Sequence, residues 1–85
     1  MSETLESLLS KGDLALQTDD TLVALLQFEM AHAMDPRPSV KAKLAYCLAR
    51  ERKEYQQAMT LCREALAAEP NNPDHYYQLS RVYLA

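Results

Sequence analysis

The stretch that decides the fold runs from residue 58 to residue 83 and reads AMTLCREALAAEPNNPDHYYQLSRVY. Its first part, up to Ala68, is rich in Ala and Leu, which are strong helix formers. Pro70 ends this helix, because proline disfavours helical geometry in the residue before it. Asn72 and Pro73 then give a typical helix start, with Asn as the N-cap and Pro at the first helical position. The stretch therefore predicts two consecutive helices joined by a short turn.

The same pattern occurs 34 residues earlier in the chain. Six sets of residues share this spacing: Pro36 and Pro70; Ala24 and Ala58; Ala31 and Ala65; Phe28 and Cys62; Ala15, Ala49 and Tyr83; Leu8, Ala42 and Tyr76. A single pair is unremarkable in an alanine-rich chain, but six sets in register indicate an internal repeat. We interpret residues 1–85 as a single domain with repeats at about 5–38 and 39–72, followed by a partial repeat or capping helix at 73–85.

The first repeat predicts an antiparallel pair of helices. One helix runs from Leu5 to a turn at 18–20, and the next runs from about Thr21 to Met34 with Asp20 as its N-cap. The alanines of the repeat allow neighbouring helices to approach closely, so we expect them to be packing residues.

The second repeat predicts a helix capped by Ser39 that ends near Arg50, a charged turn at 51–54, and a helix from about Tyr55 to Ala68. With the helix of the last unit, the expected total is about five. One glycine among 85 residues leaves little material for the tight turns of an all-β fold. The predicted class is all-α, with helix pairs that stack because neither pair can bury its apolar face alone.

The composition argues against several classes of protein. The formal charge is −3, and the nine basic residues are scattered among twelve acidic ones, which disfavours a nucleic-acid binder. Apolar runs such as 22–26 are far too short to span a membrane. The polar, acidic start at 1–4 does not resemble a secretory signal. Two cysteines are too few for a disulfide framework, so we expect a reducing, cytoplasmic setting.

The sequence offers little that could support catalysis. His32 and His75 lie in different units, and we expect both at the surface near helix ends; a His75–Asp74 catalytic pair is the less favoured alternative. Cys62 is expected in the core, whereas Cys47 could face a groove and be reactive. No glycine-rich phosphate loop and no metal-ligand spacing occurs. We predict no enzyme activity, no cofactor and no metal site.

These residues resemble the tetratricopeptide repeat family over about residues 5 to 85, some two and a half repeats. The resemblance is carried by Tyr76, Leu79, Ser80 and Tyr83 in the last unit, by Gly12, Ala24, Phe28, Ala31 and Pro36 in the first, and by Ala45, Tyr55, Ala58, Ala65 and Pro70 in the second. It implies a right-handed α-solenoid. The second unit departs from the family pattern, because bulky Tyr46 stands where a small residue is expected while Ala42 and Ala45 replace large ones. Such an exchange can conserve total volume.

The resemblance also implies a function, because such proteins usually bind a peptide or protein along the concave groove formed by the first helix of each unit. The residues carried over to that groove are Leu9, Asp13, Lys43, Cys47, Arg50, Asp74, Tyr77 and Arg81. Tyr77 and Arg81 are the best candidates, since Tyr and Arg are enriched among interface hot spots. The Lys, Asn and Arg set with which some relatives grip chaperone tails is not matched, because Leu9, Asp13, Leu44, Asp74 and Gln78 stand there.

Two other interpretations remain open. The last helix is apolar for an outermost element, so the chain could self-assemble into a homodimer through Tyr76, Leu79, Val82, Tyr83 and Leu84. Alternatively, a cluster of Tyr76, Tyr77, Arg81 and Tyr83 could stack single-stranded bases. A concentration-dependent mass would support the first, and strong salt dependence of binding would support the second.

Overall fold

Five α-helices follow one another in the computed structural model, which describes residues 3–84. They are α1 (Leu5–Gln17), α2 (Thr21–Met34), α3 (Pro38–Arg52), α4 (Tyr55–Ala68) and α5 (Pro73–Leu84). No strand occurs in the described residues, and the all-α prediction is confirmed. The predicted domain, 1–85, also contains Met1, Ser2 and Ala85, which lie outside the described residues.

Side chains satisfy the free backbone N–H groups at the start of several helices. The Thr4 hydroxyl accepts a hydrogen bond from the Ser7 N–H in α1, and the predicted N-cap Asp20 accepts one from Val23 in α2. The predicted N-cap of α5 is also present, because Asn72 Oδ1 accepts from the backbone N–H of Asp74.

The predicted start of α3 is wrong. The N-cap is Arg37 and makes no side-chain cap bond, and Pro38 occupies the first turn, so Ser39 lies inside the helix. Proline fixes the backbone angle φ near the helical value and has no N–H to satisfy, which makes a side-chain cap unnecessary at that position.

The two turns inside the helix pairs repeat the 34-residue period in the backbone itself. Asp19 and Lys53 have positive φ, 60° and 55°, and they occupy equivalent places in the two repeats. Lys53 is the left-handed C-cap of α3, which continues to Arg52. The charged turn predicted at 51–54 is therefore shorter, because two of its residues complete the last turn of the helix.

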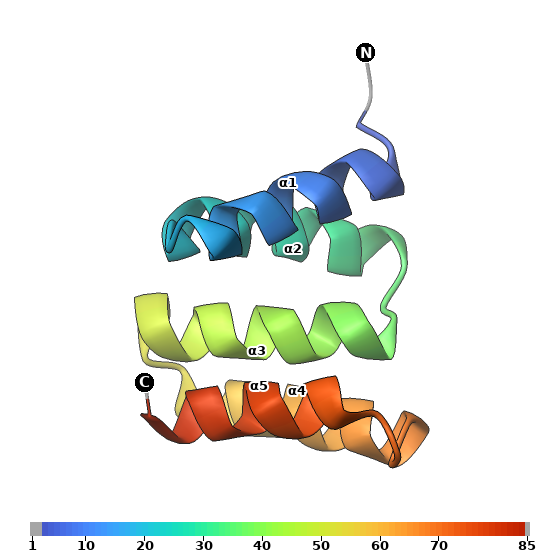
Figure 1. The fold of residues 1–85 in the computed structure, drawn as a ribbon, viewed down its shortest axis with the longest axis vertical. Helices are drawn as coiled ribbons and strands as arrows, with labels where there is room; N and C mark the ends of the chain where they lie inside the picture. The colour runs from blue at the N-terminus through green and yellow to red at the C-terminus, as the bar shows by residue number, and fades with distance from the viewer. Residues whose placement is uncertain (1–2, 85) are drawn as a thin grey trace.

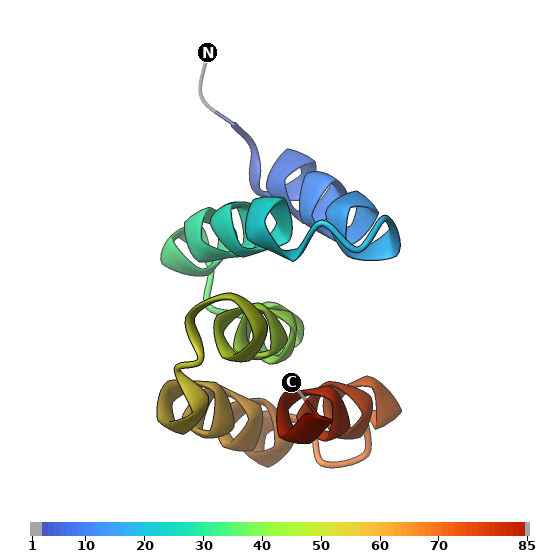
Figure 2. The same ribbon diagram turned by 90° about the vertical axis from the view of Figure 1, so that its left-hand side faces the viewer.

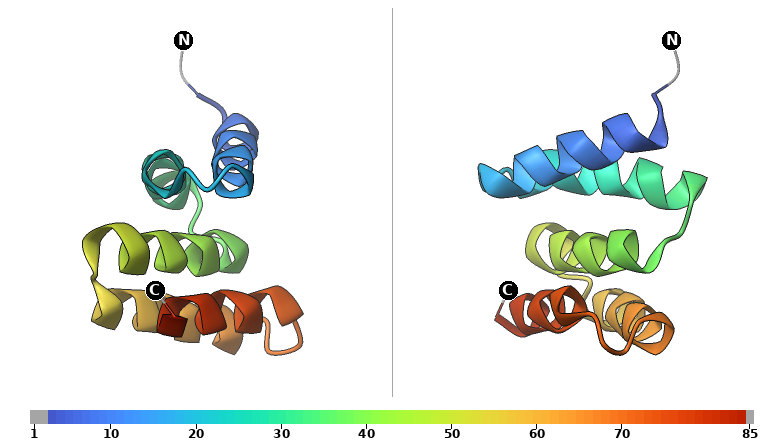
Figure 3. Two further views of the ribbon diagram at one scale, coloured as in Figure 1. Left: turned by 60° about the vertical axis from the view of Figure 1, so that its left-hand side comes forward. Right: turned by 45° about the vertical axis from the view of Figure 1, so that its right-hand side comes forward.

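The helices form stacked antiparallel pairs (Figure 1). α1 packs on α2, α2 packs on α3, and α3 also contacts α4 and α5. Figure 2 shows α1 and α5 on one side of the stack, α2 and α4 on the other, and α3 at the centre. Both views in Figure 3 show the α1–α2 pair as a layer of its own above the other three helices. The first helices of the three units, α1, α3 and α5, thus form one face of the molecule.

The core lies between the helix layers. Its largest fully buried side chain is Phe28 of α2, and it extends through α3 into α4 and α5. The repeated alanines at 24, 31, 58 and 65 are completely buried, as predicted. A smaller cluster of Leu8, Ala31 and Val40 joins α1, α2 and α3.

Candidate functional site

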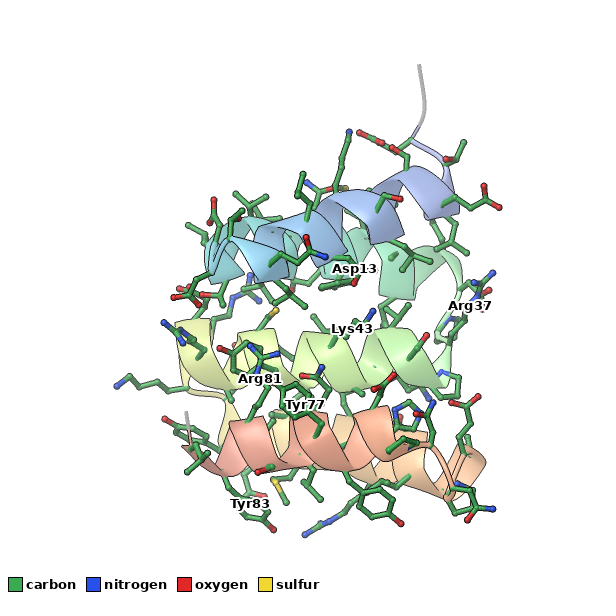
Figure 4. The ribbon with its side chains drawn as sticks, viewed as in Figure 1. Asp13, Arg37, Lys43, Tyr77, Arg81 and Tyr83 are labelled. Carbon is green, nitrogen blue, oxygen red and sulfur yellow. The ribbon has the colours of Figure 1, made fainter. Side chains whose placement is uncertain are left out.

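The face formed by α1, α3 and α5 carries four predicted groove residues that Figure 4 labels, Asp13, Lys43, Tyr77 and Arg81. An ion pair joins its upper two helices, because Lys43 Nζ lies 2.7 Å from Asp13 Oδ1. The same ammonium lies 5.9 Å from the centre of the Phe28 ring. Leu9 is half-buried beside this pair and packs on both apolar clusters. On the α1 side of the face, the charges of Lys43 and Asp13 therefore offset each other.

A second set of contacts surrounds Tyr46 on α3. Its side chain is only 5% exposed, and its hydroxyl accepts a hydrogen bond of 3.0 Å from Arg50 Nη1. Arg50 also lies 3.4 Å from the carboxylate of Asp19. The hydrogen bond that Arg50 donates to Tyr46 and the charge of Asp19 raise the pKa of the Arg50 guanidinium. Tyr46 is a buried core residue, and it also lines a hollow on this face.

Arg81 on α5 completes this side of the face. Its guanidinium carbon lies 3.6 Å from the centre of the Tyr46 ring and 5.3 Å from that of Tyr77, within the range of cation–π attraction. Figure 4 shows Arg81 and Tyr77 between α3 and α5. Within residues 3–84, Arg81 forms no ion pair. Its position is held by stacking, which leaves the N–H donors of the guanidinium available.

Two hollows flank this stack. One, of about 160 Å³, is lined by Tyr46, Arg50, Arg81 and Leu84. The other, of about 220 Å³, lies between the first halves of α3 and α5 and is lined by Ser39, Ala42, Lys43, Asn72, Asp74, His75, Tyr77 and Gln78. The α3–α5 side of the face is thus both hollowed and polar.

His75 and Gln78 contribute buried polar groups to the larger of these two hollows. His75 is 1% exposed, which corrects the prediction of a surface residue. Its Nε2 lies 2.7 Å from Glu69 Oε1, and this hydrogen bond lowers the pKa of the Glu69 carboxyl. Neither His75 Nδ1 nor Gln78 Oε1 has a hydrogen-bond partner within the described residues.

The prediction that Cys47 faces the groove is wrong. Its side chain is completely buried beneath the stack, and burial raises the pKa of the thiol to about 12. Cys62 lies in the core as predicted, and burial raises its pKa to about 11. Reactive cysteines need an accessible thiolate, so neither thiol has the properties of a nucleophile.

The apolar residues predicted to pair α5 with a second copy differ in their exposure. Val82 is buried in the core and Leu79 is half-buried against it. Tyr76, Tyr83 and Leu84 are 53%, 71% and 83% exposed, and Leu84 also lines the smaller groove hollow. Figure 4 shows Tyr83 at the lower end of the stack, away from Tyr77 and Arg81, so the proposed base-stacking cluster is divided.

Another exposed apolar row lies on α2. It consists of Leu22, Leu26, Met30 and Met34, spaced four residues apart, with Val23 beside it. Val23 also lines a hollow of about 360 Å³ between α1 and α2, together with Leu14 and Gln27. The sequence pattern concealed this row, because α2 is apolar on nearly every side and shows no clear solvent face.

Residues 49–85 match the family model of the tetratricopeptide repeat. This part of the chain is thus similar to a tetratricopeptide repeat. The matched segment contains the end of α3 and all of α4 and α5 as far as they are described. It includes residues 58–83, from which the helix pattern was first inferred. No curated protein and no solved structure matches the chain with significance. Tetratricopeptide repeats are non-catalytic modules that generally mediate interactions between proteins.

Two further features of this repeat protein concern membranes and metals. No helix in the described part of the chain combines the length and apolar character needed to cross a bilayer. Among residues 3–84, no group of three or more His, Cys, Asp or Glu side chains is arranged to hold a metal ion.

Proposed function

We propose that the face of α1, α3 and α5 is a groove that binds a segment of a partner protein carrying an acidic side chain. The observation that carries this proposal is Arg81, whose guanidinium lies over Tyr46 and beside Tyr77 without an ion-pair partner in the described residues. A guanidinium held in this way loses little conformational freedom when it binds a carboxylate through two parallel hydrogen bonds.

The surroundings of Arg81 favour the same ligand. Arg50 lines the same hollow and adds a second positive charge, which Asp19 only partly offsets at 3.4 Å. Tyr77 is mostly exposed and offers an aromatic surface next to the charge. Tyr and Arg side chains contribute most strongly at the centres of protein interfaces. On the α1 side, Asp13 holds Lys43, so an acidic ligand is expected to bind on the α3–α5 side.

The proposed role is non-catalytic, and the groove is assigned to one domain made of repeats at 5–38 and 39–72 and the unit that begins at residue 73. A reducing, cytoplasmic setting is part of the proposal. It is supported by the two cysteines, which are free thiols buried in the structure.

The test is a selection of random peptides displayed on phage against the domain, followed by affinity measurement on the recovered peptides. Peptides rich in Asp or Glu are expected, and Arg81→Glu should weaken their binding by about 30-fold, as for a hot-spot residue. Arg63→Glu makes the same charge change at an exposed residue of α4 and is the matched control. Equal losses in the two variants, or recovery of no peptide, would contradict the proposal.

Self-association is the second candidate, because Tyr76 and Tyr83 of α5 are largely exposed. Sedimentation equilibrium over a range of concentrations measures it directly. A mass that rises with concentration and is restored to the monomer by Tyr83→Glu would support a dimer through α5. The control is Leu26→Glu, because a monomer produced only by this change would place the contact on the exposed row of α2 instead.

A further inference from the structure

We propose that the hollow between the first halves of α3 and α5 binds a primary carboxamide, the group carried by an Asn or Gln side chain of the bound segment. The proposal rests on the groove being the binding surface and adds a second element to the recognised sequence, next to the acidic side chain held by Arg81. It is argued from two buried acceptor atoms and from the charges around them.

The first acceptor is a ring nitrogen of His75. A carboxylate can only accept hydrogen bonds, so the 2.7 Å contact with Glu69 Oε1 requires the proton to be on Nε2 of the imidazole. The other nitrogen of the neutral ring, Nδ1, then carries a lone pair and accepts. This atom is buried and has no partner within residues 3–84.

The second acceptor is Oε1 of Gln78, one turn further along α5. Gln78 is 6% exposed, and this oxygen is also buried without a partner in the described residues. Both residues line the same hollow. Residues three apart on a helix lie on the same face, so a rotation of the two side chains towards the hollow would bring both acceptors to a single ligand group. Buried polar atoms are nearly always paired, which makes two unpaired acceptors in one hollow evidence for a ligand that donates.

The surrounding charges select among the possible donors. Lys43 lines the hollow, and the hollow lies at the N-terminus of α5, whose peptide dipoles place partial positive charge there. Both features disfavour an ammonium or guanidinium ligand, although Asp74 reduces the effect. A carboxylate has no hydrogen to donate to Nδ1 or Oε1.

A primary carboxamide fits this mixture of groups. Its NH₂ provides two donors, one for His75 Nδ1 and one for Gln78 Oε1, and its oxygen can accept from Lys43 or from the hydroxyl of Ser39. It is also neutral, so it binds without disturbing the Lys43–Asp13 pair. The hollow, at about 220 Å³, has room for one such side chain.

The test is an NMR titration of the isotope-labelled domain with three small probes of similar size: N-acetylglutamine methylamide, N-acetylglutamate methylamide and N-acetyllysine methylamide. The glutamine probe should give saturable shifts of His75 Nδ1 and of the Gln78 side-chain amide. Gln78→Met should weaken its binding about tenfold, which corresponds to one hydrogen bond. Gln57→Met, at an exposed residue of α4, should leave its affinity unchanged.

Three results would overturn the proposal: glutamate or lysine probes that bind as well as glutamine, no effect of Gln78→Met, or no saturable shift at the solubility limit. The comparison of probes uses the unaltered protein, so it holds even where a variant fails to fold. It is also independent of the acidic-peptide test. Loss of the glutamine response with acidic peptides still bound at Arg81 would refute only the carboxamide site.

Discussion

The two repeats solve the same packing problem in opposite ways. Gly12 and Tyr46 occupy equivalent places on the first helix of each repeat, and Phe28 and Cys62 occupy equivalent places on the second. In the first repeat the bulk comes from α2, whose Phe28 ring lies so close to Gly12 that an added Cβ would be 2.6 Å from its Cζ atom. In the second repeat the bulk comes from α3, through Tyr46. Whether the large residue lies on the first or the second helix of a repeat therefore determines whether an aromatic ring lines the groove.

This difference explains why the binding chemistry is concentrated on α3 and α5. In the first repeat the Phe28 ring is fully buried, and its contact with the groove is the cation–π interaction with Lys43. In the second repeat Tyr46 lines a hollow of the groove, and its ring holds Arg81 at 3.6 Å. An exchange of large and small residues that conserves volume in the core therefore creates a distinct surface.

Truncation of Phe28, the large residue of the first repeat, should produce the largest difference in stability between the two repeats. Phe28→Ala removes a completely buried ring and is expected to cost about 3–5 kcal/mol of unfolding free energy. The equivalent change in the second repeat, Cys62→Ala, removes one small group and should cost about 1 kcal/mol. Urea unfolding followed by circular dichroism measures both, and equal losses would show that the repeats do not differ in where their bulk lies.

Filling the small position should have the next largest effect. Gly12→Ala places a methyl group against the Phe28 ring, and overpacking of this kind costs about 1–3 kcal/mol. This exceeds the gain in helix propensity, about 1 kcal/mol at most. Combining it with Phe28→Leu should recover part of the loss. Ser80→Ala, at the equivalent exposed place in α5, should change stability by less than about 0.5 kcal/mol.

The buried thiols predict a fall in stability at alkaline pH. In the unfolded chain each thiol ionises near its ordinary pKa of 9.0, whereas in the folded protein burial raises the pKa of Cys47 to about 12 and that of Cys62 to about 11. Above pH 9 the unfolded state therefore binds fewer protons, and stability declines as pH rises towards 12. The expected loss is about 1 kcal/mol for each of the two thiols one pH unit above the ordinary value.

Urea unfolding at several pH values under reducing conditions measures this slope. The control is the double variant Cys47→Ala/Cys62→Ala, which should show a shallower decline over the same range. Parallel curves for the two proteins would indicate that other groups cause the change.

The turns between helices should give the smallest difference. Lys53 has φ of 55°, where a side chain with a Cβ is strained, so Lys53→Gly is expected to stabilise the protein by about 0.5–1 kcal/mol. Asp19→Gly should gain less, because Asp tolerates this conformation and the change also removes the contact with Arg50. A larger gain at Asp19 than at Lys53, measured by thermal unfolding, would contradict this interpretation.

Much of the architecture could be predicted from local pattern. All five helices, the caps at Asp20 and Asn72 and the buried alanines were predicted, because capping and helix propensity act over a few residues. The start of α3 was missed because a proline in the first turn and a serine cap give similar local signals. The groove residues Asp13, Lys43, Asp74, Tyr77 and Arg81 were found only through the family resemblance, and their role in binding stays a prediction.

The residues that were missed share one property, which is that their surroundings come from distant parts of the chain. The ring of Tyr46 on α3 is covered by the guanidinium of Arg81 on α5. His75 is buried because α5 packs on both α3 and α4, although its position near a helix start suggested the surface. Cys47 is covered by the same packing. Periodicity along one helix indicates which residues share a face, but not which neighbour covers that face.

The sequence by itself determined the repeat, the helices and the class of the fold, because a helix forms its hydrogen bonds within one segment and a 34-residue period repeats that segment. The tertiary structure alone decided which side chains reach the groove and which acceptors lie buried without a partner. Those properties depend on how closely helices approach, and this distance is set by pairs such as Gly12 and Phe28 that no local pattern joins.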